Sequence, residues 1–111
     1  VDLNSTIEEI NNGSWYQVSS LNGSSSGISE TFQIKGQWMR IRWYMAASTP
    51  LAWVRIYVKF SNGTLYADRG SSGVYGSYSC DLAHRNIPGE YYIDVTANYV
   101  NDYSVTIWDY Y

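Results

Sequence analysis

Apolar and polar residues alternate one by one in several short segments of this chain, and this period of two limits its possible folds more than any other feature. In residues 38–45 and again in residues 53–60, every second side chain is apolar. Successive side chains of a β-strand point to opposite sides, so the pattern predicts strands with one buried and one outward face. The side chains that we expect in the core are Ile41, Trp43, Val54, Ile56, Val58, Ile93, Val95, Val105 and Ile107.

Further strand-like segments are separated by turn signals such as Asn62-Gly63. The strand-favouring residues Val, Ile, Thr, Phe, Tyr and Trp number 42, against 27 for the helix formers Ala, Leu, Glu, Lys, Gln, Met and Arg. The sequence therefore predicts an all-β chain, folded as an antiparallel, jelly-roll-like β-sandwich of seven to eight strands. The additional segments are residues 13–21, a short piece with Phe32 and Ile34, and residues 65–67, 74–80, 91–97 and 103–110.

A chain of 111 residues is expected to form one domain, which we place over residues 13–111 as a single β-sandwich. Residues 1–12 carry a different pattern, in which Leu3, Ile7 and Ile10 follow helical spacing. The same segment holds Thr6-x-x-Glu9, the spacing of a helix capping box. It fits an N-terminal linker, a short helical turn or an assembly arm.

The chain is poor in the residues that perform catalysis or bind metals. It has one cysteine, Cys80, and one histidine, His84, whereas a structural zinc site needs several such ligands. We expect Cys80 to be a small buried thiol, and His84 to be a solvent-facing turn residue beside Arg85. The sequence therefore predicts no catalytic residue, no metal site and no cofactor.

Carboxylates leave one enzymatic alternative open, because two facing acids can hydrolyse a glycosidic bond. No spacing selects a pair among them, so a carboxylate-based hydrolase is the least favoured function. Three of the acids fall in expected loops and could ligate calcium, but isolated loop acids are usually solvated. The six carboxylates are Asp68, Asp81, Glu90, Asp94, Asp102 and Asp109.

The outward faces of two strands combine aromatic and basic side chains. If the two strands are neighbours in one sheet, these residues form a single patch suited to sugar rings or to an acidic protein partner. Alternatively, the tryptophans are half covered by loops and the arginine stems lie across them. The eight candidate binding residues are Trp38, Arg40, Arg42, Tyr44, Trp53, Arg55, Tyr57 and Lys59.

Four Asn-x-Ser/Thr sequons point to an extracellular or cell-surface location and to a glycoprotein. The longest uninterrupted apolar stretch, Trp43–Ala47, is too short to span a bilayer. The start at Val1 is compatible with removal of an N-terminal anchor, and the low charge without a disulfide suits an archaeal surface protein. The candidate glycosylation sites are Asn4, Asn12, Asn22 and Asn62.

The second half of the chain resembles the closing hairpin of bacterial and archaeal pre-peptidase C-terminal domains. Ile87–Val95 contains the Pro-Gly-x-Tyr-Tyr strand entry of that family, and Tyr103–Ile107 its Tyr-x-hydrophobic-Thr strand. Phe32–Trp43 is similar to the opening strands of such sandwiches, so the resemblance covers roughly residues 28–110. It implies an extracellular, non-catalytic accessory domain, in a family with some calcium- or polysaccharide-binding members. The loops of this chain lack a dense acidic cluster, so the calcium role does not carry over.

These observations favour a non-catalytic β-sandwich module that acts through surface contact, as an accessory domain of an exported protein. The alternative is a structural subunit of a surface filament, pilus or virion, whose N-terminal segment, residues 1–27, would serve as an anchor or donated strand. We expect a protein partner or self-assembly in preference to a glycan. Ten acidic against seven basic residues, with no basic run, argue against nucleic acid.

Overall fold

The computed structural model describes residues 13–72 and 76–111, which form nine strands and no helix. Within these ranges there is accordingly no helix long and apolar enough to cross a membrane. The strands are β1 (Trp15–Gly23), β2 (Gly27–Ile28), β3 (Phe32–Ile34), β4 (Trp38–Ala47), β5 (Trp53–Phe60), β6 (Leu65–Ser72), β7 (Gly76–Arg85), β8 (Gly89–Asn98) and β9 (Asp102–Tyr110).

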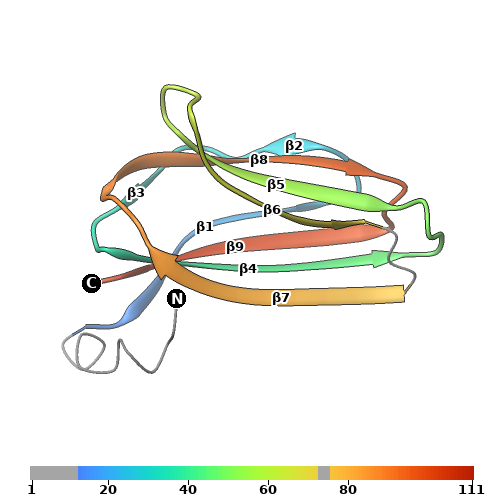
Figure 1. Cartoon of the computed structure of the whole chain (residues 1–111), viewed down its shortest axis with the longest axis horizontal. Coiled ribbons are helices and arrows are strands. Elements are labelled where there is room, and N and C mark those ends of the chain that lie inside the picture. Colours follow the sequence, from blue (N-terminus) through green and yellow to red (C-terminus); the bar gives the residue numbers. More distant parts are fainter. Residues whose placement is uncertain (1–12, 73–75) are drawn as a thin grey trace.

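The strands build two stacked antiparallel sheets (Figure 1). The four-stranded sheet has the order β1-β9-β4-β7, and the five-stranded sheet has the order β2-β8-β5-β6, with β3 also paired to β8. The predicted jelly-roll-like β-sandwich is thus confirmed. The prediction of seven to eight strands missed β2, because two residues are too few to display an alternating pattern.

The core lies between the two sheets and is formed by the alternate residues of the long strands. All nine side chains expected in the core are buried, which confirms the predicted register of these strands. Both sheets contribute side chains to this one hydrophobic cluster. The inner face of each sheet is therefore buried by the inner face of the other. Further buried members are Phe32, Ile34, Met39, Met45, Tyr91 and Tyr103.

The strand expected over residues 65–67 is longer than the alternation indicated, because residues 68–72 continue it. β6 extends to Ser72 and pairs with β5, with Gly70 opposite Arg55. A Cβ atom on Gly70 would lie 2.2 Å from the carbonyl oxygen of Val54, so glycine lets the two strands approach. Pairing with β5 thus extends β6 beyond the segment that the sequence pattern indicated.

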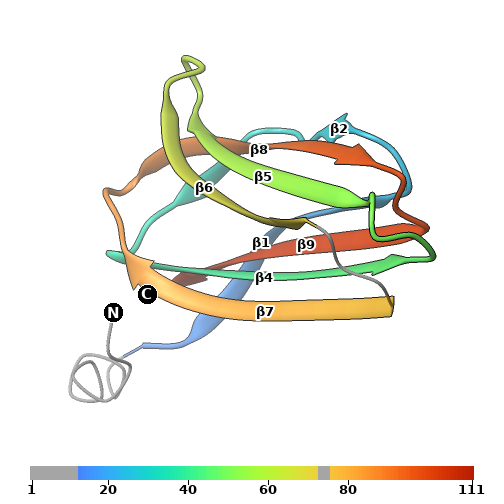
Figure 2. The ribbon, with the colours of Figure 1, turned by 45° about the vertical axis from the view of Figure 1, so that its right-hand side comes forward.

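β4 and β5 follow each other in the chain but lie in different sheets. Residues 48–52 carry the chain from the end of β4, across the sandwich, to the start of β5 (Figure 2). Their outward faces therefore point in opposite directions. This crossover determines where the candidate binding residues lie.

Candidate functional site

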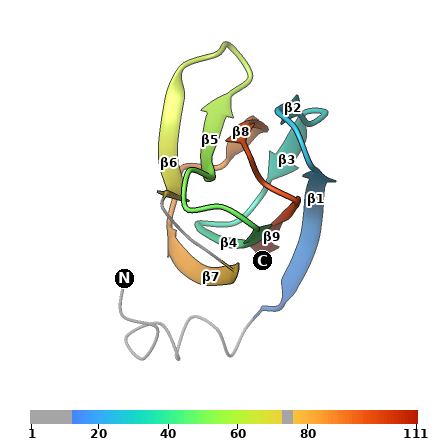
Figure 3. The same ribbon diagram turned by 90° about the vertical axis from the view of Figure 1, so that its right-hand side faces the viewer.

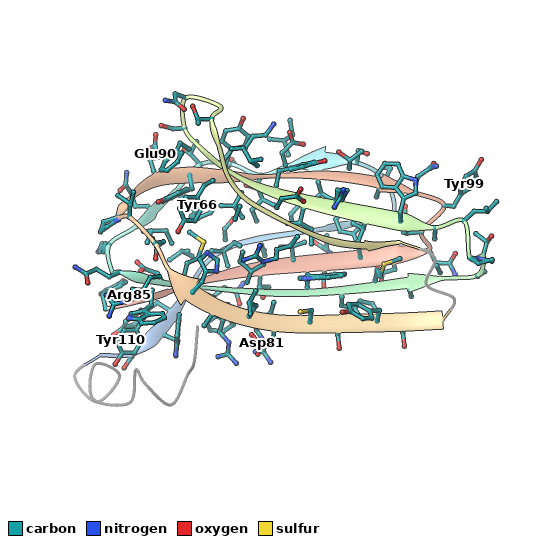
Figure 4. The ribbon with its side chains drawn as sticks, in the orientation of Figure 1. Tyr66, Asp81, Arg85, Glu90, Tyr99 and Tyr110 are labelled. Atoms are coloured by element: carbon teal, nitrogen blue, oxygen red, sulfur yellow. The ribbon has the colours of Figure 1, made fainter. Side chains whose placement is uncertain are left out.

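The structure divides the eight predicted binding residues between two opposite faces. Trp38, Arg40, Arg42 and Tyr44 lie on the outer side of the four-stranded sheet, because they alternate with buried residues of β4. Trp53, Arg55, Tyr57 and Lys59 lie on the outer side of the five-stranded sheet, by the same alternation in β5. In Figure 4, Asp81 and Glu90 mark these two outer sides. The expected single patch was wrong, because the two strands are not neighbours.

Trp38 is also less available than its outward position suggested. The guanidinium group of Arg85 lies 4.9 Å from the centre of its ring, and only 6 % of the residue is exposed. Arg85 is opposite Trp38 in the β4–β7 pairing, so both side chains lie on one face. The arginine on the neighbouring strand thus covers the tryptophan, and only Trp53 of the two remains half-exposed.

On the five-stranded sheet, the cations of β5 are paired with acids of its neighbours. The Nζ of Lys59 donates a 2.8 Å hydrogen bond to Asp94, and this bond raises the pKa of the lysine. Arg55 lies 3.7 Å from the carboxylate of Asp68. This face therefore carries one exposed ion pair, Arg55–Asp68, and one half-buried pair, Lys59–Asp94, and no charge is left unbalanced between these partners.

On the four-stranded sheet, a shallow groove of about 500 Å³ crosses β7, β4 and β9. The strand register brings its residues together, because directly opposed residues of antiparallel strands share a face. Tyr44 lies between Ser79 and Ser104, and Arg42 lies between Asp81 and Thr106. The groove is lined by Arg42, Tyr44, Ser79, Asp81, Ser104, Thr106 and Trp108.

Two arginines share one carboxylate beside this groove. Arg40 donates two hydrogen bonds to Asp81, with Nε–Oδ1 and Nη2–Oδ2 distances of 2.8 and 2.6 Å, and Arg42 Nε lies 3.3 Å from Oδ2. The hydrogen bond from Arg40 lowers the pKa of Asp81 and raises that of Arg40. Asp81 therefore stays ionised near neutral pH, and the triad carries one excess positive charge.

Trp108 and Tyr44 supply the aromatic surfaces of the groove. The indole Nε1 of Trp108 donates a 3.1 Å hydrogen bond to the hydroxyl of Thr106, which fixes the ring, and Tyr44 is 36 % exposed. The alternation in β9 placed Trp108 outward, but nothing in the sequence indicated that β9 lies beside β4. The role of Asp81 in the groove was also missed. It was expected in a loop, whereas it lies on β7 opposite Arg42.

The aromatic surface continues past the groove towards the start of β4. The rings of Trp15 and Tyr110 meet edge to face at 5.2 Å, and the guanidinium of Arg40 lies 5.8 Å from the centre of Trp15. Tyr110 is opposite both Trp15 and Trp38 across the sheet. The outer side of the four-stranded sheet thus combines aromatic rings in edge-to-face contact with arginines.

The expectations for the single histidine and cysteine need revision. His84 is not in a turn: it lies on β7, half-buried, with its ring stacked at 5.9 Å on that of Tyr66. Burial, and next the positive charge of Arg69, lower the pKa of His84 from 6.5 to about 4. Cys80 is a free thiol on the same face of β7 and is half-buried rather than buried. The prediction of a turn at His84 was wrong because β7 continues beyond Cys80 to Arg85, whereas Cys80 packs against the core cluster.

Most of the six carboxylates considered for hydrolysis are in ion pairs or buried. Asp68, Asp81 and Asp94 are in ion pairs, and Asp109 is fully buried. No cluster of three or more His, Cys, Asp or Glu side chains that could hold a metal ion occurs among the described residues. The groove with its arginine–aspartate triad is therefore the candidate functional site in this part of the chain.

Two of the four candidate glycosylation sites can be located. Asn22 is exposed near the end of β1, and Asn62 is exposed in the turn after β5, where its side-chain oxygen accepts the Thr64 N–H at 2.9 Å. Asn22 belongs to a strand rather than to the expected turn. Asn4 and Asn12 lie outside the described residues.

Comparison with known proteins gives similarities of overall shape only. No protein-family model matches the sequence. Of the resemblance to pre-peptidase C-terminal domains, the β-sandwich fold is shown, and membership of that family is not. No curated protein matches the sequence either.

Several solved structures are similar at low sequence identity. The SPBc2 prophage-derived protein YomS is 14 % identical with a TM-score of 0.48, the match covering 89 % of this chain and 93 % of that one. The module TmCBM61, solved in complex with β-1,4-galactotriose, is 13 % identical with a TM-score of 0.44, covering 92 % and 88 %. A chain of infectious bursal disease virus is 8 % identical with a TM-score of 0.47; the match covers 89 % of this chain and only 32 % of the viral one.

Proposed function

We propose that this protein is a non-catalytic, extracellular β-sandwich module that binds a glycan on the outer side of its four-stranded sheet. The observation that carries the proposal is the groove between β7, β4 and β9, which combines two aromatic rings with hydroxyl groups and the Arg42–Asp81 pair. Its volume of about 500 Å³ is within the usual range of small-molecule sites, roughly 300–1,000 Å³.

The groove offers partners both for the apolar C–H face of a sugar ring and for its hydroxyl groups. The apolar C–H face of a pyranose can stack on Tyr44 or Trp108, because aromatic rings offer a flat, partly apolar surface. The hydroxyls of the sugar can bond to Ser79, Ser104 and Asp81, since charged hydrogen-bond partners are the stronger ones. A rigid sheet holds all of these groups, so little order has to be gained on binding.

The test is binding to an array of soluble oligosaccharides, followed by calorimetry with the best ligand. Trp108→Ala and Tyr44→Ala should each weaken binding at least about tenfold, as expected for aromatic anchors. Trp53→Ala, on the opposite sheet, is the matched control and should leave the affinity unchanged. Absence of binding to every glycan, or an equal loss in the control, would contradict the proposal.

A second candidate, contact with a protein or with another copy of the chain, is favoured by the edge of β7. This ten-residue strand has no partner beyond it among the described residues, and Tyr78 and Leu82 are 42 % and 36 % exposed on it. Long edge strands with exposed apolar side chains readily pair with other strands. Self-assembly predicts oligomers in sedimentation velocity that Leu82→Lys dissolves, whereas a purely glycan-binding module sediments as a monomer.

A further inference from the structure

A second hollow, separate from the groove, lies between the edge strands of the two sheets. β6 and β7 run along the same side of the sandwich, away from β1 (Figure 3). Between them is a space of about 550 Å³ lined by Leu65, Tyr66, Asp68, Arg69 and His84, here called the β6–β7 hollow. The hydroxyl of Tyr66 donates a 2.8 Å hydrogen bond to the Arg85 carbonyl, which ties β6 to the end of β7 beside it.

Arg69 faces the inside of the sandwich without a counter-ion. It is opposite the buried Ile56 in the β5–β6 pairing and therefore shares its inward face. Its Nη1 donates to the carbonyl oxygen of Asp68 at 2.8 Å, whereas its buried Nε has no hydrogen-bond partner. Over residues 13–72 and 76–111, no carboxylate lies within ion-pair distance of it. An arginine is always charged, so an anion that entered the hollow would meet a positive charge without a counter-ion among these residues.

His84 reaches the same hollow from the opposite sheet and has unmet hydrogen bonds as well. Both of its ring nitrogens are buried without a partner. Among the described residues, the groups that face the ring are Tyr66 and Arg69 from β6, while its cross-strand neighbour on β4 is Met39, which does not titrate. Tyr91 of β8 meets the Tyr66 ring edge to face at 5.3 Å, and burial raises the pKa of both tyrosines, so neither carries charge at neutral pH.

We infer that the β6–β7 hollow is a binding site for a carboxylate, whose oxygens accept hydrogen bonds from Arg69 Nε and from the His84 ring. This site is independent of the glycan groove. A single permanent cation among the lining residues, Arg69, calls for a singly charged anion rather than a phosphate dianion. Each unmet donor then has an acceptor, and the inward charge of Arg69 is neutralised.

Binding of a carboxylate is expected to be linked to protonation of His84. A negative charge within hydrogen-bond distance raises a histidine pKa by about one to three units. If the pKa rises from about 4 to about 6 on binding, the affinity at pH 5 should be about tenfold higher than at pH 7. A site that merely attracted anions to Arg69 would show no such dependence.

The single histidine allows a direct measurement, because one ring signal reports on one site. The His84 ring resonances would be followed by NMR during titration with sodium formate and with sodium glucuronate at pH 5 and pH 7. Both carboxylates should shift the resonances and raise the His84 pKa by at least about one unit. Stronger binding of glucuronate than of formate would indicate a sugar acid as the ligand, and equal binding a simple carboxylate.

Chloride at equal ionic strength and uncharged glucose are the ligand controls, and neither should change the pKa. Arg69→Gln should abolish the response, and Arg69→Lys serves as a second variant that keeps the charge and should retain part of it. Arg55→Gln, on the outer face of the same sheet, should respond like the wild-type protein. An unchanged pKa with both carboxylates, or the same shift with chloride, would overturn the inference without affecting the glycan groove.

Discussion

At the scale of single residues, Asp109 shows how one buried carboxylate can fix the path of the chain. It is fully buried on β9, and its two oxygens accept the backbone N–H groups of Lys35 and Gly36 at 2.8 and 3.0 Å. These donors belong to the turn between β3 and β4, which connects the two sheets. The side chain thus replaces the hydrogen bonds that a strand partner would otherwise provide.

Asp109→Asn should lower the free energy of unfolding by about 1–3 kcal/mol. The amide keeps one acceptor oxygen but places an NH₂ group against a backbone donor, and a buried unmet donor costs about that much. Urea denaturation would measure the loss. Asp102→Asn, an exposed acid at the start of the same strand, is the control and should stay within about ±0.5 kcal/mol. Equal behaviour of the two variants would contradict the role of Asp109.

His84 should make the protein less stable as the pH falls from about 6.5 to about 4. Its pKa is about 4 in the folded protein and 6.5 in a free histidine, so the unfolded chain binds more protons throughout this window. The contribution is fully present above pH 6.5 and lost progressively below it. Because the ring is partly solvated, we expect about 1–2 kcal/mol rather than the full value of the shift.

Denaturation at a series of pH values would check this dependence, with His84→Leu as the control. The leucine variant should lose the slope between pH 4 and 6.5, while the loss below pH 4 that comes from the ion-paired Asp81 remains. A slope that persists in the leucine variant would assign the titration to another group.

At the scale of elements, the pairing of β5 with β6 depends on the absence of a side chain at Gly70. A methyl group there would meet the backbone of Val54, which cannot rotate away as a side chain can. The close approach extends β6 as an edge strand to Ser72 and brings Arg69 beside His84. A glycine that suggests a loop in the sequence is thus the residue that permits a strand.

Gly70→Ala should destabilise the protein by about 1–3 kcal/mol, because β5 and β6 must move apart to admit the methyl group. Gly23→Ala is the matched control, since its nearest contact would be an ordinary 3.7 Å from the Tyr103 hydroxyl. Thermal unfolding of both variants would compare them. A Gly70→Ala protein as stable as the control would mean that β6 is not paired along its whole length.

At the scale of the whole molecule, the sandwich has one core that both sheets share and two outer faces with different chemistry. The outer side of the four-stranded sheet carries the groove and an arginine-rich, aromatic surface, whereas the cations of β5 on the other side are matched by acids. The shared core joins the two sheets that carry these surfaces. A change in the core should therefore affect both sheets at once.

Ile56→Ala should cost about 2–5 kcal/mol, because the residue is completely buried between the sheets. Unfolding followed by tryptophan fluorescence and by far-ultraviolet circular dichroism should remain coincident, as expected for one cooperative unit. Arg55→Ala, its exposed neighbour, is the control and should have little effect. Two separate transitions would indicate that the sheets fold independently.

The sequence by itself determined the strands and which of their faces are buried. Alternation is a local property, since each side chain points opposite to its neighbour, so the inward set that includes Ile41, Ile56 and Ile107 could be read directly. The tertiary structure alone decided which strands are neighbours. The crossover between β4 and β5 divided the expected patch, and the pairing of β7 and β9 with β4 brought Asp81 and Trp108 to the groove. Strand neighbours are selected by long-range packing, which a pattern of period two does not encode.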